Sequence, residues 1–345
     1  MSSFEWVSSS TRLSELVDLW LQKDFVVLDT EFIRRRTYYA ELGLLQVADG
    51  EGYYLIDPLA IADLADLLRP LLVSERVEKV FHSGEEDLEI LGLLLGEPLR
   101  YGMDTQLAWG FITSDASVGY ARMVETELGV EVPKDQTQSN WLQRPLSEQQ
   151  CQYAVNDVVY LYQLYPALRS RLQALGRHEW VREDVDRIAR KVLERQAEDY
   201  YQNLRQAWSL TGKRLWLLQQ LAAERERRCQ ALNVNRKALI SDPDVALLAE
   251  KRPSDLGHIA SLTAISPSVL RRESDWIIAL IERSQHVTKA DYPEQVQGPL
   301  PREYADDFQS VRQHLQQIAE TEQLPREYLV RKRDLERVVS DLRRG

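Results

Sequence analysis

Short apolar runs of the length of β-strands open the chain. Phe25–Leu28 is a compact run of β-prone residues, and Leu42–Val47 and Tyr53–Ile56 have the same character. Asp49 and Gly50 stand between the last two runs, as expected for a turn. Three successive strands with short connections predict an antiparallel meander.

Helical periodicity alternates with further strands in the rest of the first half. The spacing of apolar residues predicts helices over residues 11–21, 61–72 and 85–95, a strand over 77–81 and a weaker strand over 99–103. Ser83 and Glu86 have the spacing of a capping box, which predicts the start of the helix at 85. Ser147 and Gln150 repeat this spacing and predict a helix that continues to about 168.

The second half shows helical periodicity throughout. It predicts long helices over residues 181–204 and 213–232, shorter helices out to about 281, and two final helices over 302–321 and 326–342. Residues 291–301 contain three prolines and a glycine, which indicates a linker.

Composition narrows the class of protein. The chain has 345 residues, enough for two or three domains, and 44% of them are hydrophobic. No apolar stretch approaches the ~18 residues of a membrane span, and no secretory signal is visible. The two cysteines, Cys151 and Cys229, exclude a disulfide scaffold. We therefore expect a cytoplasmic protein that does not associate with membranes.

Charge is distributed unevenly around the net value of −11. Residues 1–150 carry 26 acidic and 12 basic side chains, a net charge of −14, whereas residues 151–345 carry 28 and 31, a net charge of +3. The acidic half suits divalent cations, and the second half is the better source of an anion-binding face. Ordinary variation of charge along a chain is the alternative.

Two acidic side chains end the first predicted strand. Asp29 and Glu31 are two residues apart, so they point to the same face of that strand. Asp87 falls in the first turn of the helix from 85, where an acid also simply complements the helix dipole. Tyr153 and Asp157 are four residues apart and share one face of the helix from 147. Taken singly, each has a structural explanation.

Together these residues predict a metal centre. Four converging carboxylates would have raised pKa values unless a divalent cation lay among them. Mg²⁺ prefers oxygen ligands, and two such ions about 4 Å apart suit the displacement of a phosphoryl group. This chemistry requires neither cysteine nor histidine.

At these residues the chain resembles the ribonuclease D family of DEDD 3′–5′ exonucleases, in the subgroup with a tyrosine in its third motif. The resemblance extends over about residues 25–164. The three motif-like segments are Leu28–Phe32 (LDTEF), Val80–Glu89 (VFHSGEEDLE) and Tyr153–Leu161 (YAVNDVVYL). Residues 103–106 (MDTQ) and 139–146 (SNWLQRPL) support the likeness.

The resemblance implies an α/β fold like that of RNase H, with a mixed sheet flanked by helices. It implies that Asp29, Glu31 and Asp157 hold the metal ion that activates water. Asp29 would bridge to a second ion, which Asp87 would hold mainly through water. Tyr153 would orient the attacking water, and 5′-mononucleotides would leave one at a time from a 3′ end.

Residues 213–289 resemble an HRDC domain, a small helical module that binds nucleic acid. We expect an exonuclease domain over 1–204, an HRDC domain over 205–290, and a linker with a partial second HRDC-like module over 291–345. The last part either packs on the first module or lacks its final helices. The fold class is therefore an α/β exonuclease domain followed by all-α HRDC-type domains.

Several residues are candidates for contact with nucleic acid. Arg34, Arg35 and Arg36 follow the first motif directly. Trp141 and Arg144 are candidates for a substrate groove, although a core tryptophan is an equal alternative. The helical half adds basic side chains that bind phosphates only if the fold gathers them, namely Lys213, Arg214, Arg236 and Lys237.

The leading hypothesis is an exoribonuclease that uses two Mg²⁺ ions, or Mn²⁺, to trim RNA with a free 3′ end. By resemblance, its substrates are tRNA precursors. One alternative is a DNA 3′–5′ exonuclease, because the motifs do not recognise the 2′-hydroxyl. Another is a catalytically weak RNA-binding protein on the same fold. The sequence gives no indication of an obligate protein partner.

Overall fold

The computed structural model describes residues 3–132 and 139–344. Contacts divide the chain into two compact units. The first comprises Met1–Ile33, Glu41–Glu194 and Arg302–Gly345, and the second comprises Arg34–Ala40 and Arg195–Pro301. The domains expected over 1–204, 205–290 and 291–345 rest on sequence motifs. This division into functional domains stays a prediction.

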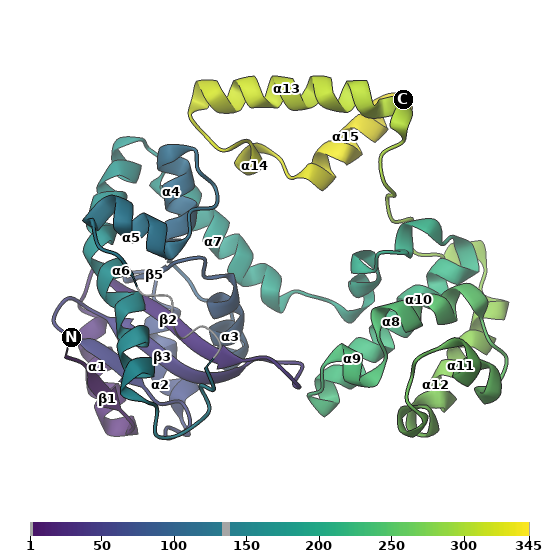
Figure 1. The fold of residues 1–345 in the computed structure, drawn as a ribbon, viewed down its shortest axis with the longest axis horizontal. Helices are drawn as coiled ribbons and strands as arrows, with labels where there is room; N and C mark the ends of the chain where they lie inside the picture. Colours follow the sequence, from purple (N-terminus) through teal and green to yellow (C-terminus); the bar gives the residue numbers. More distant parts are fainter. Residues whose placement is uncertain (1–2, 133–138, 345) are drawn as a thin grey trace. The chain divides into compact units, whose positions relative to one another are not determined.

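The described part of the first unit contains one mixed sheet in the order β1-β4-β3-β2-β5-β6 (Figure 1). The predicted meander is present, because β3 pairs antiparallel with both β2 and β4. The other neighbours are parallel. The strands are β1 (Glu5–Val7), β2 (Phe25–Ile33), β3 (Glu41–Ala48), β4 (Tyr53–Ile56), β5 (Glu78–Phe81) and β6 (Gly102–Asp104). Three-residue β1 was not predicted, since so short a strand carries no readable alternation.

Helices flank this sheet, and the long helix α6 packs against β2, β3 and β4. Those of the first unit are α1 (Ser10–Trp20), α2 (Leu64–Leu72), α3 (Glu85–Leu95), α4 (Thr105–Thr113), α5 (Tyr120–Leu128), α6 (Glu148–Ala174), α7 (His178–Leu193), α13 (Ala305–Glu322), α14 (Arg326–Leu329) and α15 (Lys332–Arg344). No helix in the described ranges is both long and apolar enough to cross a membrane.

The two predicted capping boxes have different outcomes. The box of Ser147 and Gln150 at the start of α6 is confirmed, with both reciprocal hydrogen bonds present. The box of Ser83 and Glu86 is wrong. Ser83 has a φ of 57°, and Gly84 is the N-cap without a side-chain bond. The carboxylate of Asp104 instead accepts the amides of Ser83 and Gly84, at 3.1 and 2.8 Å.

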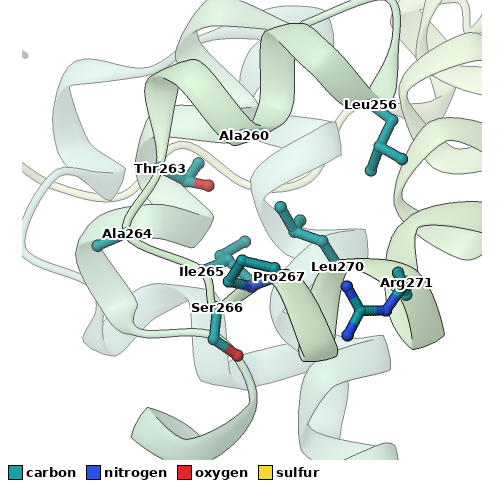
Figure 2. A pocket seen from close by; sticks show the side chains of 9 residues that line it. All are labelled: Leu256, Ala260, Thr263, Ala264, Ile265, Ser266, Pro267, Leu270 and Arg271. Carbon is teal, nitrogen blue, oxygen red and sulfur yellow. The ribbon is translucent and has the colours of Figure 1, made fainter.

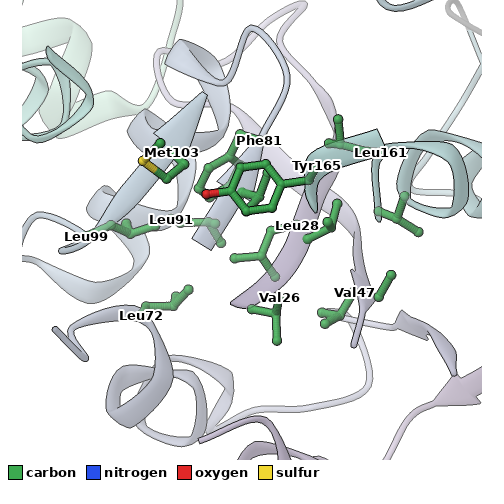
Figure 3. Close-up of a cluster of buried hydrophobic side chains, with 14 of the residues drawn as sticks. Val26, Leu28, Val47, Leu72, Phe81, Leu91, Leu99, Met103, Leu161 and Tyr165 are labelled. Atoms are coloured by element: carbon green, nitrogen blue, oxygen red, sulfur yellow. The ribbon is translucent and has the colours of Figure 1, made fainter. Parts of the chain in front are cut away.

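The core of the first unit joins the sheet to its helices (Figure 3). Val26 and Leu28 of β2 are fully buried, as is Leu91 of α3. Tyr165 of α6 is buried too, and its hydroxyl donates to Glu78 Oε2 at 2.6 Å. This packing holds β2 and α6 in fixed relation, which determines where their acidic residues lie.

The C-terminal helices belong to the first unit. Leu324 and Tyr328 pack into its core, and the ring of Tyr328 lies 4.7 Å from that of Phe111 in α4. Arg177 donates to the carbonyls of Phe111 and Glu322, at 2.7 and 2.5 Å. This tail was expected either to pack on the first HRDC-like module or to lack the final helices of a second one, so its packing on the exonuclease fold was not predicted.

The second unit is helical. Its elements include α8 (Gly212–Leu232), α9 (Arg236–Leu239), α10 (Asp242–Lys251), α11 (Leu256–Leu262) and α12 (Pro267–His286). The helix predicted over 181–204 ends at Leu193, and Ala197–Asn203 forms a 3₁₀ turn. Arg225 and Glu226 are buried inside this unit. Arg225 Nη1 donates to the carbonyl of Ile240 at 3.0 Å and forms an ion pair with Asp242 at 2.7 Å, which compensates its charge.

Candidate active site

Three carboxylates converge between β2 and α6. One ligand oxygen each from Asp29, Glu31 and Asp157 lies within 4.8 Å of the other two. Opposite ligands of an octahedral Mg²⁺ ion are about 4 Å apart, so this spacing fits direct coordination of one ion. The structure thus brings together acids that are 128 positions apart in the chain, counting from Asp29 to Asp157.

The packing of α6 on the sheet places Asp157 over β2. Ala154, Val155 and Val159 of the helix are buried against Leu44 and Leu55 of the sheet. The face of β2 that carries Asp29 also carries Glu31, because alternate residues of a strand share a face. Burial of ordinary apolar side chains therefore brings the three carboxylates together.

Asp87 lies beside this group but outside it. It sits in the first turn of α3, is 7% exposed, and accepts a 2.5 Å hydrogen bond from the hydroxyl of Thr30. Burial raises the pKa of Asp87 to about 6, although the bond from Thr30 lowers it. Its charge also helps to raise the pKa of Asp29.

The acidic group is electrostatically unfavourable without a cation. Burial, and then the charges of Asp157 and Asp87, raise the pKa of Glu31 to about 9. Burial raises the pKa of Asp157 to about 7. Burial and the charges of Asp87, Asp157 and Glu31 raise the pKa of Asp29 well above its ordinary value.

This donor set fits a hard divalent cation. Within residues 3–132 and 139–344, no ion pair links Asp29, Glu31 or Asp157 to a basic side chain. All three offer carboxylate oxygens, which are the ligands that Mg²⁺ and Mn²⁺ prefer. A bound cation would favour the ionised form of each acid.

Tyr153 is placed to act at the same group. It precedes Asp157 by one turn of α6, which puts its hydroxyl on the same face of the helix as that carboxylate. Burial, and then the charges of Asp157, Glu31 and Asp29, raise the pKa of Tyr153. The phenol therefore stays neutral at physiological pH and keeps its proton for donation.

Trp141 and Arg144 occupy structural positions. Trp141 is 2% exposed and packs with Leu44 and Cys151, which is the core placement that the sequence left as an alternative. Arg144 donates to both carboxylate oxygens of Asp57, at 2.9 and 2.6 Å. It also donates to the carbonyl of Gly43 at 2.6 Å.

The contact between Arg144 and Gly43 supports the acidic group. The register of β2 and β3 shifts after Glu31, which pairs with Leu44, while Phe32 pairs with Leu42. Gly43 is the extra residue of this bulge, and a Cβ there would lie 2.6 Å from the carbonyl oxygen of Trp141. Arg144 therefore holds the bulge that adjoins Glu31.

We expect Arg144→Leu to destabilise the protein by about 3 kcal/mol, because it leaves the buried carboxylate of Asp57 unpaired. The free energy of unfolding is measured by urea titration with tryptophan fluorescence. The matched control is Arg12→Leu, since Arg12 pairs with Glu5 at the surface and should cost less than about 1 kcal/mol. Equal losses in the two variants would contradict this role for Arg144.

Two neighbours of the acidic group were not predicted. The hydroxyl of Tyr120 lies 2.6 and 3.0 Å from the carbonyl oxygens of Asn156 and Asp157, and thereby braces α6. Thr30 holds Asp87. Tyr120 lies outside every motif, so no sequence pattern pointed to it. Thr30 stands between the two acids of β2, and that position was the available signal.

The other predicted basic residues fall in the second unit. Arg34, Arg35 and Arg36 are exposed, and Asn235 bonds to the carbonyls of Arg35 and Arg36, each at 2.9 Å. The fold thereby gathers these arginines beside Arg236 and the exposed Lys237. Arg236 binds Glu226 at 2.7 Å and lies over the ring of Tyr200, so its charge is largely engaged inside the unit.

The remaining two basic candidates lie at the start of α8. Lys213 donates to the carbonyl of Gln285, and Arg214 is exposed. They are about two dozen positions before Arg236 in the chain. Their binding to nucleic acid stays a prediction.

A hollow of about 510 Å³ lies between α11 and α12 (Figure 2). Leu256, Ile265 and Leu270 line it, and Arg271 is its charged side chain. Because this lining contains no carboxylate that could hold a metal ion, the hollow does not compete with the acidic group as a metal centre.

The comparisons with known proteins agree with this geometry. The sequence model of a family described as 3′–5′ exonuclease matches residues 4–173. Ribonuclease D of Pseudomonas paraeruginosa is 34% identical over 96% of this chain and 88% of its own length. Ribonuclease D of Escherichia coli K12 is 30% identical over 98% and 90%.

Solved structures show the same relationship. The crystal structure of Escherichia coli RNase D, described as an exoribonuclease involved in structured RNA processing, has a TM-score of 0.89. It is 30% identical and covers 98% of this chain and 90% of that one. The catalytic core of RRP6 from Trypanosoma brucei shares the fold, with a TM-score of 0.63 and 19% identity over 83% and 80% of the two chains.

Proposed function

Because this chain belongs to the ribonuclease D family and is a 3′–5′ exoribonuclease, we propose that its acidic group is the hydrolytic centre and holds two Mg²⁺ ions. The observation that carries the proposal is the convergence of Asp29, Glu31 and Asp157 within 4.8 Å. Dependence on a divalent metal is a property of the exonuclease family. The identity of the ion and the number of ions are part of the proposal, and Mn²⁺ is the alternative.

Each acid has a proposed role. Asp29, Glu31 and Asp157 would hold one ion, and Asp29 and Asp87 would hold the second. Asp87 also accepts a hydrogen bond from Thr30. When bound, divalent ions lower the pKa of water and neutralise charge on the phosphate. The hydroxyl of Tyr153 orients the attacking water beside Asp157.

The proposed substrates are structured RNAs with a free 3′ end, and tRNA precursors in particular. The description of the Escherichia coli relative as a processor of structured RNA supports this choice. Arg34, Arg35, Arg36 and Lys237 are exposed in the second unit and supply its proposed phosphate contacts, in the manner of an HRDC domain. Both cysteines are free and buried, which suits the proposed cytoplasmic location.

The decisive experiment uses RNA and DNA labelled at either end, with Mg²⁺, Mn²⁺ or chelator. We expect stepwise shortening from the 3′ end of RNA, with release of 5′-mononucleotides, and only when metal is present. Equal degradation of DNA would favour the DNA alternative. Binding without shortening in every condition would overturn the catalytic assignment.

We expect Tyr153→Phe to slow the chemical step about 100-fold, because the ring remains and only the hydroxyl that orients water is lost. Single-turnover rates measure this step, and RNA affinity should stay within about twofold. Tyr162→Phe is the matched control, since Tyr162 lies on the same helix but bonds to the carbonyl of Asp49. An unchanged single-turnover rate in Tyr153→Phe would remove the proposed role.

A further inference from the structure

A buried amide on β3 is not explained by the packing around it. Gln46 is 0% exposed. Neither Oε1 nor Nε2 of its side chain has a hydrogen-bond partner among the described residues. Since an unpaired buried amide is unfavourable, a residue that served only to fill this space would be expected to be apolar.

The register of the sheet places this amide opposite Asp29. Gln46 pairs with Asp29 of β2 on one side and with Leu55 of β4 on the other. Directly opposed residues of antiparallel strands share a face, with Cβ atoms about 5 Å apart. A glutamine side chain is long enough to bring its amide to the neighbouring carboxylate.

The other neighbours on that face are apolar. Leu44 and Ala48 flank Gln46 along β3, and both are fully buried, as is Leu55. Leu44 and Leu55 pack against α6, the helix that carries Asp157. Among its cross-strand and same-strand neighbours on this face, Asp29 is therefore the polar partner available to Gln46.

We propose that Gln46 is a positioning residue for Asp29, whose ionised carboxylate accepts a hydrogen bond from Gln46 Nε2 when it holds a divalent ion. The inference rests on the proposed function of the acidic group. A carboxylate that holds metal keeps lone pairs directed away from the ion, and a donor to them fixes its orientation. Because the Gln46 amide is fully buried, such a bond is strong and geometrically specific.

The test is a titration of the full chain with Mn²⁺, in which the free ion is followed by electron paramagnetic resonance. We expect Gln46→Met to weaken the tighter Mn²⁺ site about tenfold, because the donor is lost while side-chain volume is kept. Gln46→Asn shortens the amide by one methylene and should weaken the site similarly. Thermal unfolding without metal should show that both variants are folded, and Gln46→Met should unfold no earlier than wild type.

Leu55→Met is the matched control, since Leu55 adjoins Gln46 on the side away from Asp29. Its Mn²⁺ affinity should equal that of wild type. Wild-type Mn²⁺ affinity in a folded Gln46→Met variant would overturn the inference and leave the proposed function standing. Weakening of Mn²⁺ binding in Leu55→Met equal to that in Gln46→Met would do the same. Absence of Mn²⁺ binding by the wild type would overturn both.

Discussion

Asp157→Asn is expected to lower the turnover number for RNA trimming about 10,000-fold, because it removes ~5 kcal/mol of metal-based stabilisation of the transition state. Asparagine keeps the size of the side chain but carries no charge. Only the carboxylates of Asp29 and Glu31 would then remain to hold the ion. Asp29→Asn should have an effect of the same size, since Asp29 lies within the same 4.8 Å group.

Single-turnover rates on a 3′-labelled RNA measure this loss, with metal at saturation. Asp18→Asn is the control, because Asp18 is an exposed acid on α1. Without metal, the melting temperature should not fall in Asp157→Asn, since the substitution removes a charge that the neighbouring acids repel. Turnover within tenfold of wild type would contradict the assignment of Asp157 as a metal ligand.

The pairs of side chains that each element contributes to the acidic group were predictable because their determinants are local. Asp29 and Glu31 share a strand face through the period of two, and Tyr153 and Asp157 share a helix face through the period of four. The meander and the start of α6 follow from equally local rules, and both were predicted. Only the docking of α6 on the sheet had to be assumed.

Where a local sequence pattern gave a wrong prediction, a contact with a residue far away in the chain explains the difference. Ser83 and Glu86 have the right spacing for a capping box, yet Asp104 from β6 takes the amides at that helix start. Arg144 was a candidate for the substrate groove, yet it forms an ion pair with Asp57, which directly follows β4. In both cases a partner remote in the chain satisfies the group that a local pattern had assigned elsewhere.

Domain membership failed to follow chain order for the same reason. Residues 34–40 continue β2 in sequence but belong to the second unit. Asn233 Oδ1 accepts the amides of Tyr38 and Tyr39, each at 3.2 Å, and Tyr38 donates to Glu226 at 2.9 Å. Composition and periodicity give no sign of these bonds, since the segment is a short polar connection between two strands.

Removal of metal should abolish trimming and also make stability depend on pH. In the metal-free protein, burial holds the pKa of Glu31 at about 9 and that of Asp157 at about 7. The unfolded chain releases the same protons near pH 4. As pH rises from about 4 to 9, the unfolded state therefore loses protons first, and the free energy of unfolding falls.

The difference in the free energy of unfolding with and without Mg²⁺ separates the contribution of the acidic group from those of other titrating groups. Buried Lys79 acts with the opposite sign, because its pKa is lowered to about 7 and its neutral form favours folding at higher pH. Mg²⁺ at 100 times its dissociation constant stabilises the folded state by about 2.7 kcal/mol. That should raise the melting temperature of the first unit by about 5 °C at pH 8.

This Mg²⁺-dependent rise in melting temperature should be smaller at pH 5. The acids of the folded protein are then protonated, and protons compete with the ion for the carboxylate oxygens. Calorimetry at both pH values, with Mg²⁺ or with chelator, measures it. Asp157→Asn should lose most of the increment at pH 8, whereas Asp18→Asn should keep it. Lys79 is unchanged in both variants. A Mg²⁺-dependent rise in melting temperature that persists in Asp157→Asn would therefore locate the ion elsewhere. RNA trimming that survives the chelator would show that hydrolysis does not need the metal.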